Sequence, residues 1–166
     1  QNYLLAALLR QPDLLAAIDR ALRESSAGAL SPQDFTESEF QGLFTQLENS
    51  LHQAEMTPVE FLRTKIDPGL QECWDVLWQR GEKLKVEDER RAQDVINAAI
   101  RLRLRNLGVW LQELQFLENA AHEQGELVQA QSYQELTLQH TRELRGLQRL
   151  LWNDSSSLRV AGSVQL

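Results

Sequence analysis

A run of 39 residues, 86–124, contains no proline and a single glycine, Gly108. Apolar residues recur along it at spacings of three and four, which is the period of one face of an α-helix. A continuous helix of this length would extend about 58 Å at a rise of about 1.5 Å per residue. This is longer than the core of one compact domain requires. The run therefore predicts a chain organised around one long connecting helix.

A second periodic run, residues 127–152, follows directly after Gly125. A glycine in this position is typical of a helix C-terminus, and two long helices joined by a tight turn must run antiparallel. We therefore expect a helical hairpin over residues 106–152. The residues expected along its seam are Leu107, Trp110 or Leu111, Leu114, Leu117 and Ala121 in the first helix, and Tyr133, Leu136, His140, Leu144, Leu147 and Leu151 in the second.

The preceding residues, 1–105, contain shorter periodic segments separated by helix-start signals. Pro12-Asp13, Ser31-Pro32, Thr57-Pro58 and Asp67-Pro68 are expected to begin helices or turns. Thr36 and Glu39 have the spacing of a capping box. Residues 1–105 therefore predict a small bundle of five or six helices. The apolar residues expected in its core include Phe40, Leu43, Phe44, Leu47, Leu62, Trp74, Leu77 and Trp78.

The composition favours an all-α fold, because 30 leucines stand against 12 valines and isoleucines together. We expect a small helical bundle, then a long connecting helix, then a protruding antiparallel hairpin. Residues 153–166 have no period and predict a flexible C-terminal tail. The single cysteine, Cys73, excludes an internal disulfide and a cysteine-rich zinc site. No apolar run approaches the roughly 18 residues of a membrane span, so we expect no membrane contact. The one unpaired cysteine favours a reducing compartment, so we expect a cytoplasmic location.

The net charge of −7 argues against direct contact with nucleic acid, which requires a basic surface. Arg101, Arg103 and Arg105 form a local basic run, but a spacing of two spreads them over about 200° of a helix. Phosphate-binding glycine loops are absent from the sequence. The three histidines lie far apart along the chain, and Cys73 has the helical neighbours of a small core residue. We therefore expect a non-catalytic domain with no cofactor, metal ion or small-molecule substrate.

Three segments resemble the C-terminal helicase-binding domain of bacterial DNA primase, DnaG. They are LLAALLRQPDLLAAID (4–19), SPQDFTESEFQGLF (31–44) and the block LRLRNLG…LQRLL (102–151). The first two also share their character with the N-terminal domain of the replicative helicase DnaB. The Glu-, Gln- and Leu-rich hairpin of the third segment favours primase. The resemblance covers residues 2–152, and the opening of the chain inside an apolar pattern suggests a piece of a longer protein.

The resemblance implies a domain that docks primase on the hexameric helicase DnaB at the replication fork in the nucleoid. Docking would coordinate primer synthesis with unwinding, while the full-length protein would be a DNA-directed RNA polymerase with its catalytic domains upstream. Gly146 departs from the pattern, because it interrupts the last helix at a cost of about 1 kcal/mol relative to Ala. The hairpin's last helix would supply the main contact, through Gln139, Arg142, Glu143, Arg145 and Arg149, with Tyr133, Leu138 and Gln148 completing the predicted surface.

Two other functions fit the same pattern. The chain has features of the N-terminal collar domain of the helicase itself, which would assemble into trimers or hexamers. It is also compatible with a structural module in which the helical hairpin is an oligomerisation arm. The arginines of the hairpin would then pair with its own glutamates at i, i+4 and keep it in solution.

Overall fold

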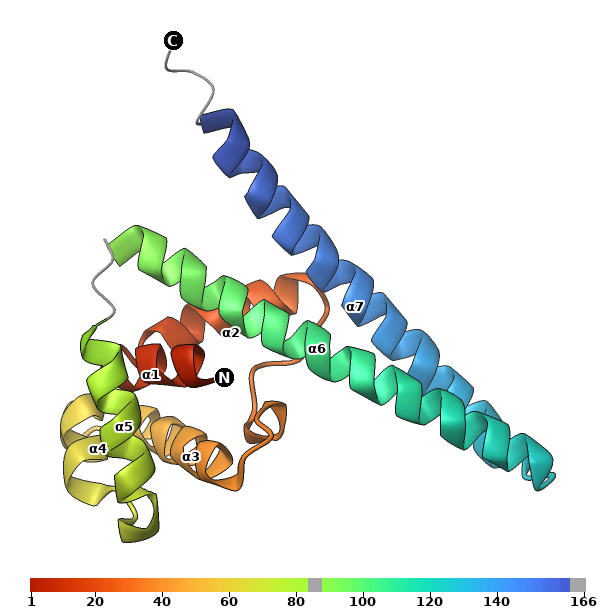
Figure 1. Cartoon of the computed structure of the whole chain (residues 1–166), viewed down its shortest axis with the longest axis horizontal. Helices are drawn as coiled ribbons and strands as arrows, with labels where there is room; N and C mark the ends of the chain where they lie inside the picture. The colour runs from red at the N-terminus through yellow and green to blue at the C-terminus, as the bar shows by residue number, and fades with distance from the viewer. Residues whose placement is uncertain (84–87, 162–166) are drawn as a thin grey trace. The chain divides into compact units, whose positions relative to one another are not determined.

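The computed structural model describes residues 1–83 and 88–161, and the side chains of these residues apart from 88, 89, 91 and 153–161. Within these ranges every regular element is a helix and no strand is present, so the predicted all-α fold is confirmed. Figure 1 shows the seven α-helices and the two short 3-10 helices, η1 and η2. Their bounds are α1 Asn2–Arg10, α2 Leu14–Glu24, η1 Pro32–Asp34, α3 Ser38–His52, α4 Pro58–Lys65, η2 Pro68–Leu70, α5 Gln71–Glu82, α6 Asp88–Glu123 and α7 Leu127–Ala161.

Two of the predicted helix starts are stabilised by side-chain caps. At the start of α4, the Thr57 hydroxyl accepts a hydrogen bond from the Glu60 N–H (3.3 Å). The Glu60 carboxylate in turn accepts from the Thr57 N–H (3.2 Å) and hydroxyl (2.8 Å). At the start of η2, the Asp67 carboxylate accepts from the Gly69 N–H (2.7 Å). In both cases proline follows the cap, where its missing N–H costs no hydrogen bond.

The predicted capping box between Thr36 and Glu39 is wrong. The helix α3 begins at Ser38, and its N-cap residue, Glu37, makes no side-chain cap. Thr36 instead donates from its N–H and its hydroxyl to the side-chain oxygen of Gln1 (3.4 and 3.0 Å). A reciprocal box lies one turn earlier, where the Ser31 N–H donates to the Asp34 carboxylate (2.9 Å).

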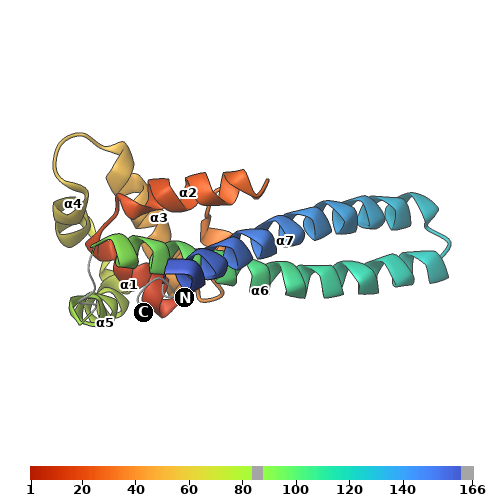
Figure 2. The same cartoon turned by 90° about the horizontal axis from the view of Figure 1, so that it is seen from above.

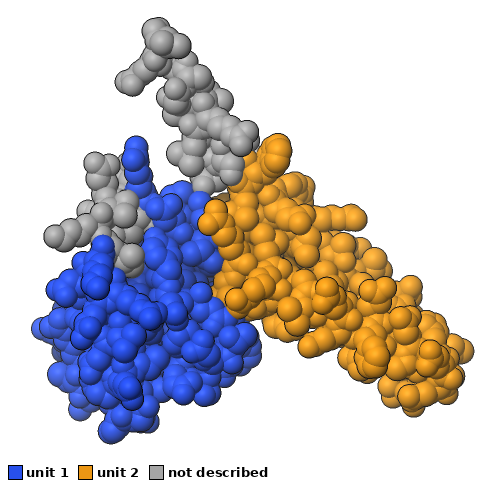
Figure 3. All heavy atoms as spheres, in the orientation of Figure 1, with its two compact units in different colours: residues 1–21, 29–99 blue, residues 22–28, 100–166 orange. Residues whose placement is uncertain are grey.

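The chain divides into two compact units (Figure 3), residues 1–21 with 29–99 and residues 22–28 with 100–166. We call these unit 1 and unit 2. The domains predicted from the sequence, 1–105, 106–152 and 153–166, differ from these units in two respects. The division falls inside α6 at 99/100, and the short segment 22–28 belongs with the later part of the chain. The domain boundaries themselves stay a prediction.

Unit 1 has a core built around α1, which packs against α3, α4 and α5. Two rings, Phe35 and Phe44, lie 5.2 Å apart between centroids and are fully buried. The predicted core therefore lies inside this unit. The largest fully buried side chains of the unit are Leu4, Leu5, Leu8, Leu9, Ile18, Phe35, Leu43, Phe44, Leu47, Leu62 and Leu77.

The two tryptophans of α5 stack on each other, but they differ in burial. The ring centroids lie 5.1 Å apart at an interplanar angle of 15°. Trp74 is buried as predicted, whereas Trp78 is only half-buried. The Arg10 guanidinium lies 3.7 Å above the Trp78 ring and donates to the Trp78 carbonyl oxygen (2.9 Å). The face of the Trp78 ring is therefore covered by a cation rather than by an apolar side chain.

Unit 2 contains the second part of α6 and the helix α7, which lie side by side in Figures 1 and 2. The helix α6 passes through Gly108 without a break and ends at Glu123. Gly125 then has a φ of 75°, a left-handed conformation that favours glycine. The Glu126 N–H donates to the Ala121 carbonyl (2.9 Å), as in a helix end closed by a glycine. The predicted helix end at Gly125 is therefore confirmed.

The seam between these helices differs from the predicted one at two leucines. Leu117 and Leu136 are both exposed, the latter by 42%. The half-buried positions beside them are polar, Glu118 and Thr137. Along α7, one set of buried and half-buried positions follows the alternating three–four spacing of a coiled-coil seam. Its members are Ala130, Tyr133, Thr137, His140, Leu144, Leu147 and Leu151.

The helix α7 runs to Ala161, past the predicted end at Trp152. The sequence NDSSS at 153–157 has no apolar residues at helical spacing, which is why it predicts a flexible tail. Polar residues, however, can continue a helix that is already nucleated, since each added residue completes one further hydrogen bond. Residues 162–166 lie outside the described residues.

Among the residues that the structure describes, no helix is both long enough and apolar enough to cross a membrane.

Candidate partner-binding surface

One exposed face of α7 carries most of the residues predicted to bind a partner. On a helix with about 100° per residue, positions 138, 142, 145, 148, 149 and 152 fall within a sector of about 120°. The seam residues of α7 lie on the other side of the helix. Leu138 is 55% exposed and Trp152 is 76% exposed. We call this set, Leu138, Arg142, Arg145, Gln148, Arg149 and Trp152, the arginine face.

The last two turns of the arginine face surround an open hollow of about 730 Å³. Its described lining consists of Arg142, Arg145, Gln148, Arg149 and Trp152, so three guanidinium groups and one indole meet there. Arginine and tryptophan are the residue types that most often dominate binding at protein interfaces. The hollow therefore has the composition of a binding surface.

The three arginines of this face have no carboxylate partner within ion-pair distance among the described side chains. The Arg149 Nε donates only to the Arg145 carbonyl oxygen (3.4 Å). The i, i+4 pairing with the hairpin's own glutamates is therefore not formed by Arg142, Arg145 or Arg149. Their guanidinium groups keep the donor capacity that engages carboxylates in pairs of parallel hydrogen bonds.

The other predicted contact residues lie away from the arginine face. Tyr133 is half-buried in the seam. Glu143 is also half-buried, with its carboxylate 3.5 Å from Nδ1 of His140, and Gln139 donates to it (3.4 Å). The His140 ring in turn lies 5.7 Å from the Trp110 ring of α6. Gln139, Glu143 and Tyr133 therefore do not line the hollow.

Trp152 is the residue of this surface that is missing from the predicted contact residues. It follows Arg145 and Arg149 at spacings of seven and three, which places all three on one side of a helix. This spacing could have identified Trp152 from the sequence, because the last helix of the hairpin is predicted to extend to residue 152.

Gly146 lies one turn after Arg142 on α7 and contacts the segment 22–28. A Cβ atom at this position would overlap the Ser25 carbonyl oxygen. Ser25 is itself buried, and its hydroxyl donates to the Leu22 carbonyl (2.7 Å). The glycine that interrupts the helix pattern thus permits the close approach of a loop to the helix backbone.

Metal-binding clusters and the thiol of Cys73 are two kinds of potential catalytic group. Among them there is no group of three His, Cys, Asp or Glu side chains that could hold a metal ion. Burial raises the pKa of the Cys73 thiol, and the nearby Glu39 and Glu37 carboxylates raise it further. The thiol is therefore protonated at neutral pH, whereas the thiolate is the nucleophilic form.

The chain was compared with protein-family models, with curated proteins and with solved structures, and none of the three comparisons found a match.

Proposed function

We propose that this chain is the helicase-binding domain of a bacterial DNA primase of the DnaG type. In this proposal it docks primase on the hexameric replicative helicase DnaB and couples primer synthesis to unwinding. The domain itself is non-catalytic, and the polymerase activity belongs to other parts of the full-length protein. Its site of action is the replication fork, in the cytoplasm.

The observation that carries the proposal is the hollow of the arginine face. The resemblance in sequence implies a partner contact on the last helix, and four of the residues it implicates line this hollow: Arg142, Arg145, Gln148 and Arg149. Guanidinium groups without a carboxylate partner among the described side chains, next to an exposed indole, are suited to a protein surface that offers carboxylates and apolar side chains. The all-α fold is compatible with such a docking role.

The experiment is a calorimetric titration of the full chain against the cognate hexameric helicase, without nucleotide. We expect saturable binding that the double substitution Arg142→Ala with Arg145→Ala weakens at least about tenfold, because each lost charged hydrogen bond at an interface costs about 1.5–3 kcal/mol. The matched control is Arg101→Ala with Arg105→Ala. These arginines are also exposed, and they lie on α6 of the same unit.

Equal loss of binding in both double variants would mean that only net charge matters, and it would refute the assignment of the arginine face. Absence of any binding by the unsubstituted chain would refute the primase proposal itself.

A second candidate, a structural oligomerisation module, is favoured by exposed apolar side chains in unit 2. Phe116 is 73% exposed, and Val109, Leu127, Val128 and Leu138 are exposed as well. Such residues are often covered in an assembly. Light scattering across a range of concentrations distinguishes the candidates: self-association of the chain alone, without helicase binding, supports this module or the helicase collar domain.

A further inference from the structure

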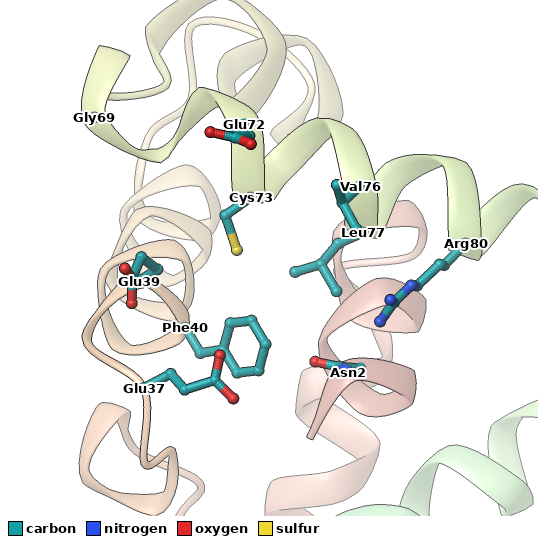
Figure 4. A pocket seen from close by; sticks show the side chains of 10 residues that line it. All are labelled: Asn2, Glu37, Glu39, Phe40, Gly69, Glu72, Cys73, Val76, Leu77 and Arg80. Carbon is teal, nitrogen blue, oxygen red and sulfur yellow. The ribbon is translucent and has the colours of Figure 1, made fainter.

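An open cavity of about 430 Å³ lies in unit 1 and shares no residue with the arginine face. It is formed where the starts of α1 and α3 meet η2 and α5 (Figure 4). Its floor is apolar: Phe40 and Leu77 are buried, and the Cys73 sulfur points into the space between them. Val76, on the wall, keeps 45% of its surface exposed. The floor of the cavity is therefore buried, and Val76 is the apolar side chain of the lining that stays open to solvent.

Three carboxylates stand around this apolar floor. Glu37 and Glu39 approach it from the start of α3 and Glu72 from the start of α5, while Arg80 lies on the far side (Figure 4). Among the described side chains, no Lys, Arg or His lies within ion-pair distance of these three glutamates. The rim thus carries three negative charges and one positive charge.

Helix dipoles explain part of this arrangement but not all of it. Glu39 and Glu72 lie in the first turns of α3 and α5, where negative charge is favourable. This effect does not require the carboxylates to surround a concave surface, nor does it account for an exposed valine on the wall of the same cavity. A ligand that carries both a cation and an apolar group satisfies both features at once.

We propose that this cavity binds a protein segment that presents a lysine or arginine next to an apolar side chain. The cation lies among the Glu37, Glu39 and Glu72 carboxylates, and the apolar side chain covers Val76. The methylene stem of a lysine or arginine can lie on the same apolar floor while its charged head reaches the rim. Charge complementarity of this kind selects the partner and sets its orientation. The site is independent of the proposed helicase contact on α7.

The test is an NMR titration of the uniformly ¹⁵N-labelled full chain with three synthetic eight-residue peptides, acetylated and amidated at their ends. One alternates Lys and Leu, one alternates Lys and Ser, and one alternates Glu and Leu. We expect saturable binding of the Lys–Leu peptide only, with the largest shifts at the amides of Phe40, Val76 and Leu77. Equal binding of the Lys–Ser peptide would show attraction to an acidic chain without a site and would overturn the proposal, as would no saturable binding.

Substitution of the three glutamates tests whether they bind the cation of the peptide. The triple variant Glu37→Gln, Glu39→Gln, Glu72→Gln is expected to bind the Lys–Leu peptide about tenfold more weakly, because three partly exposed ion pairs are lost. The matched control replaces three exposed glutamates of unit 2 by glutamine, at positions 113, 123 and 126, with the same change in net charge. The proposal fails if the control loses as much binding as the triple variant.

A second variant keeps the test decisive if the triple variant is poorly folded. Val76→Lys places a cation on the cavity wall, at a position that is already partly exposed, and should weaken peptide binding to a similar extent. Unchanged binding in a folded Val76→Lys variant would overturn the proposal. The variant Arg142→Ala with Arg145→Ala should bind the peptide normally, which separates the failure of this site from the failure of the helicase contact.

Discussion

Two glycines inside the long helices, Gly108 and Gly146, have opposite surroundings. Around Gly108 a Cβ atom would meet nothing within 4 Å, whereas at Gly146 it would overlap the Ser25 carbonyl oxygen. Both glycines have the same low helix propensity. Their roles therefore differ only through packing, since Gly146 permits a close approach and Gly108 does not.

We expect Gly146→Ala to lower the free energy of unfolding by up to about 2 kcal/mol, since overpacking outweighs the gain in helix propensity. Gly108→Ala, the matched control, should raise it by about 0.5–1 kcal/mol. Urea denaturation followed by circular dichroism measures both. A stabilising effect of alanine at both positions would contradict the contact with Ser25.

The pair formed by Thr57 and Glu60 at the start of α4 makes a prediction about pH. Hydrogen bonds from the Thr57 hydroxyl and N–H hold the pKa of the Glu60 carboxyl below its ordinary value. A lowered folded-state pKa contributes stability above the unfolded-state value of about 4.3, and this contribution is lost as the pH falls through the folded-state pKa. In Thr57→Val the pKa of Glu60 should rise towards its ordinary value, while in Thr57→Ser it should stay low. An NMR titration of the Glu60 side chain distinguishes the two, and equal pKa values in both variants would exclude the hydroxyl as the cause.

At the scale of elements, a residue's position along the helix decides whether it lies in the seam between α6 and α7 more than its apolar character does. On α7, Thr137 lies in the seam between two exposed leucines, Leu136 and Leu138. The Thr137 hydroxyl donates to the Tyr133 carbonyl of its own helix (2.9 Å), so its burial leaves no donor unpaired. An amphipathic helix that places leucines beside its seam keeps apolar surface available to a partner.

We therefore expect unequal costs from two leucine truncations on α7. Leu147→Ala should reduce the free energy of unfolding by about 2–5 kcal/mol, because Leu147 is fully buried. Leu136→Ala should cost less than about 1 kcal/mol, because the side chain is largely in solvent. Thermal and urea denaturation of both variants tests this contrast. Similar losses of unfolding free energy in the two variants would indicate that Leu136 packs in the seam, as the sequence predicts.

The same elements show what the sequence can and cannot specify. Proline, glycine and capping signals identify most helix starts, because they act on neighbouring residues: Thr57-Pro58 and Asp67-Pro68 begin helices as predicted. The period of the apolar residues predicts long helices after residue 86. It does not decide whether Leu136 or Thr137 faces α6, because that choice depends on the partner helix. For the candidate site, residue types and spacing predict the arginines of α7, but the absence of internal partners for them is a property of the folded chain.

At the scale of the whole molecule, the chain passes between the two units three times, after residues 21, 28 and 99. Within the segment 22–28, the residues SSAG at 25–28 have the composition of a loop. Its place in unit 2 depends on a contact between residues far apart along the chain, Ser25 and Gly146. Local sequence patterns do not predict such a contact, apart from the unexpected glycine in the helix. A division of the chain at one point therefore cannot separate the two units.

This interleaving predicts that residues 1–105 alone are an incomplete structure. In the full chain, Leu22 and Ala27 are buried, and the Ala27 N–H donates to the Leu22 carbonyl (3.0 Å) at the end of α2. Removal of residues 106–166 deletes α7 and with it the backbone that packs on Ser25. We expect the Ala27 amide to exchange with solvent at least about tenfold faster in the shortened chain, because local opening then costs less free energy. Amides in the middle of α3, such as that of Leu47, serve as the internal control and should keep their protection. If the Ala27 amide stays as protected as in the full chain, segment 22–28 does not depend on unit 2, and the boundary predicted at residue 105 describes the folding units better than the division at 99/100.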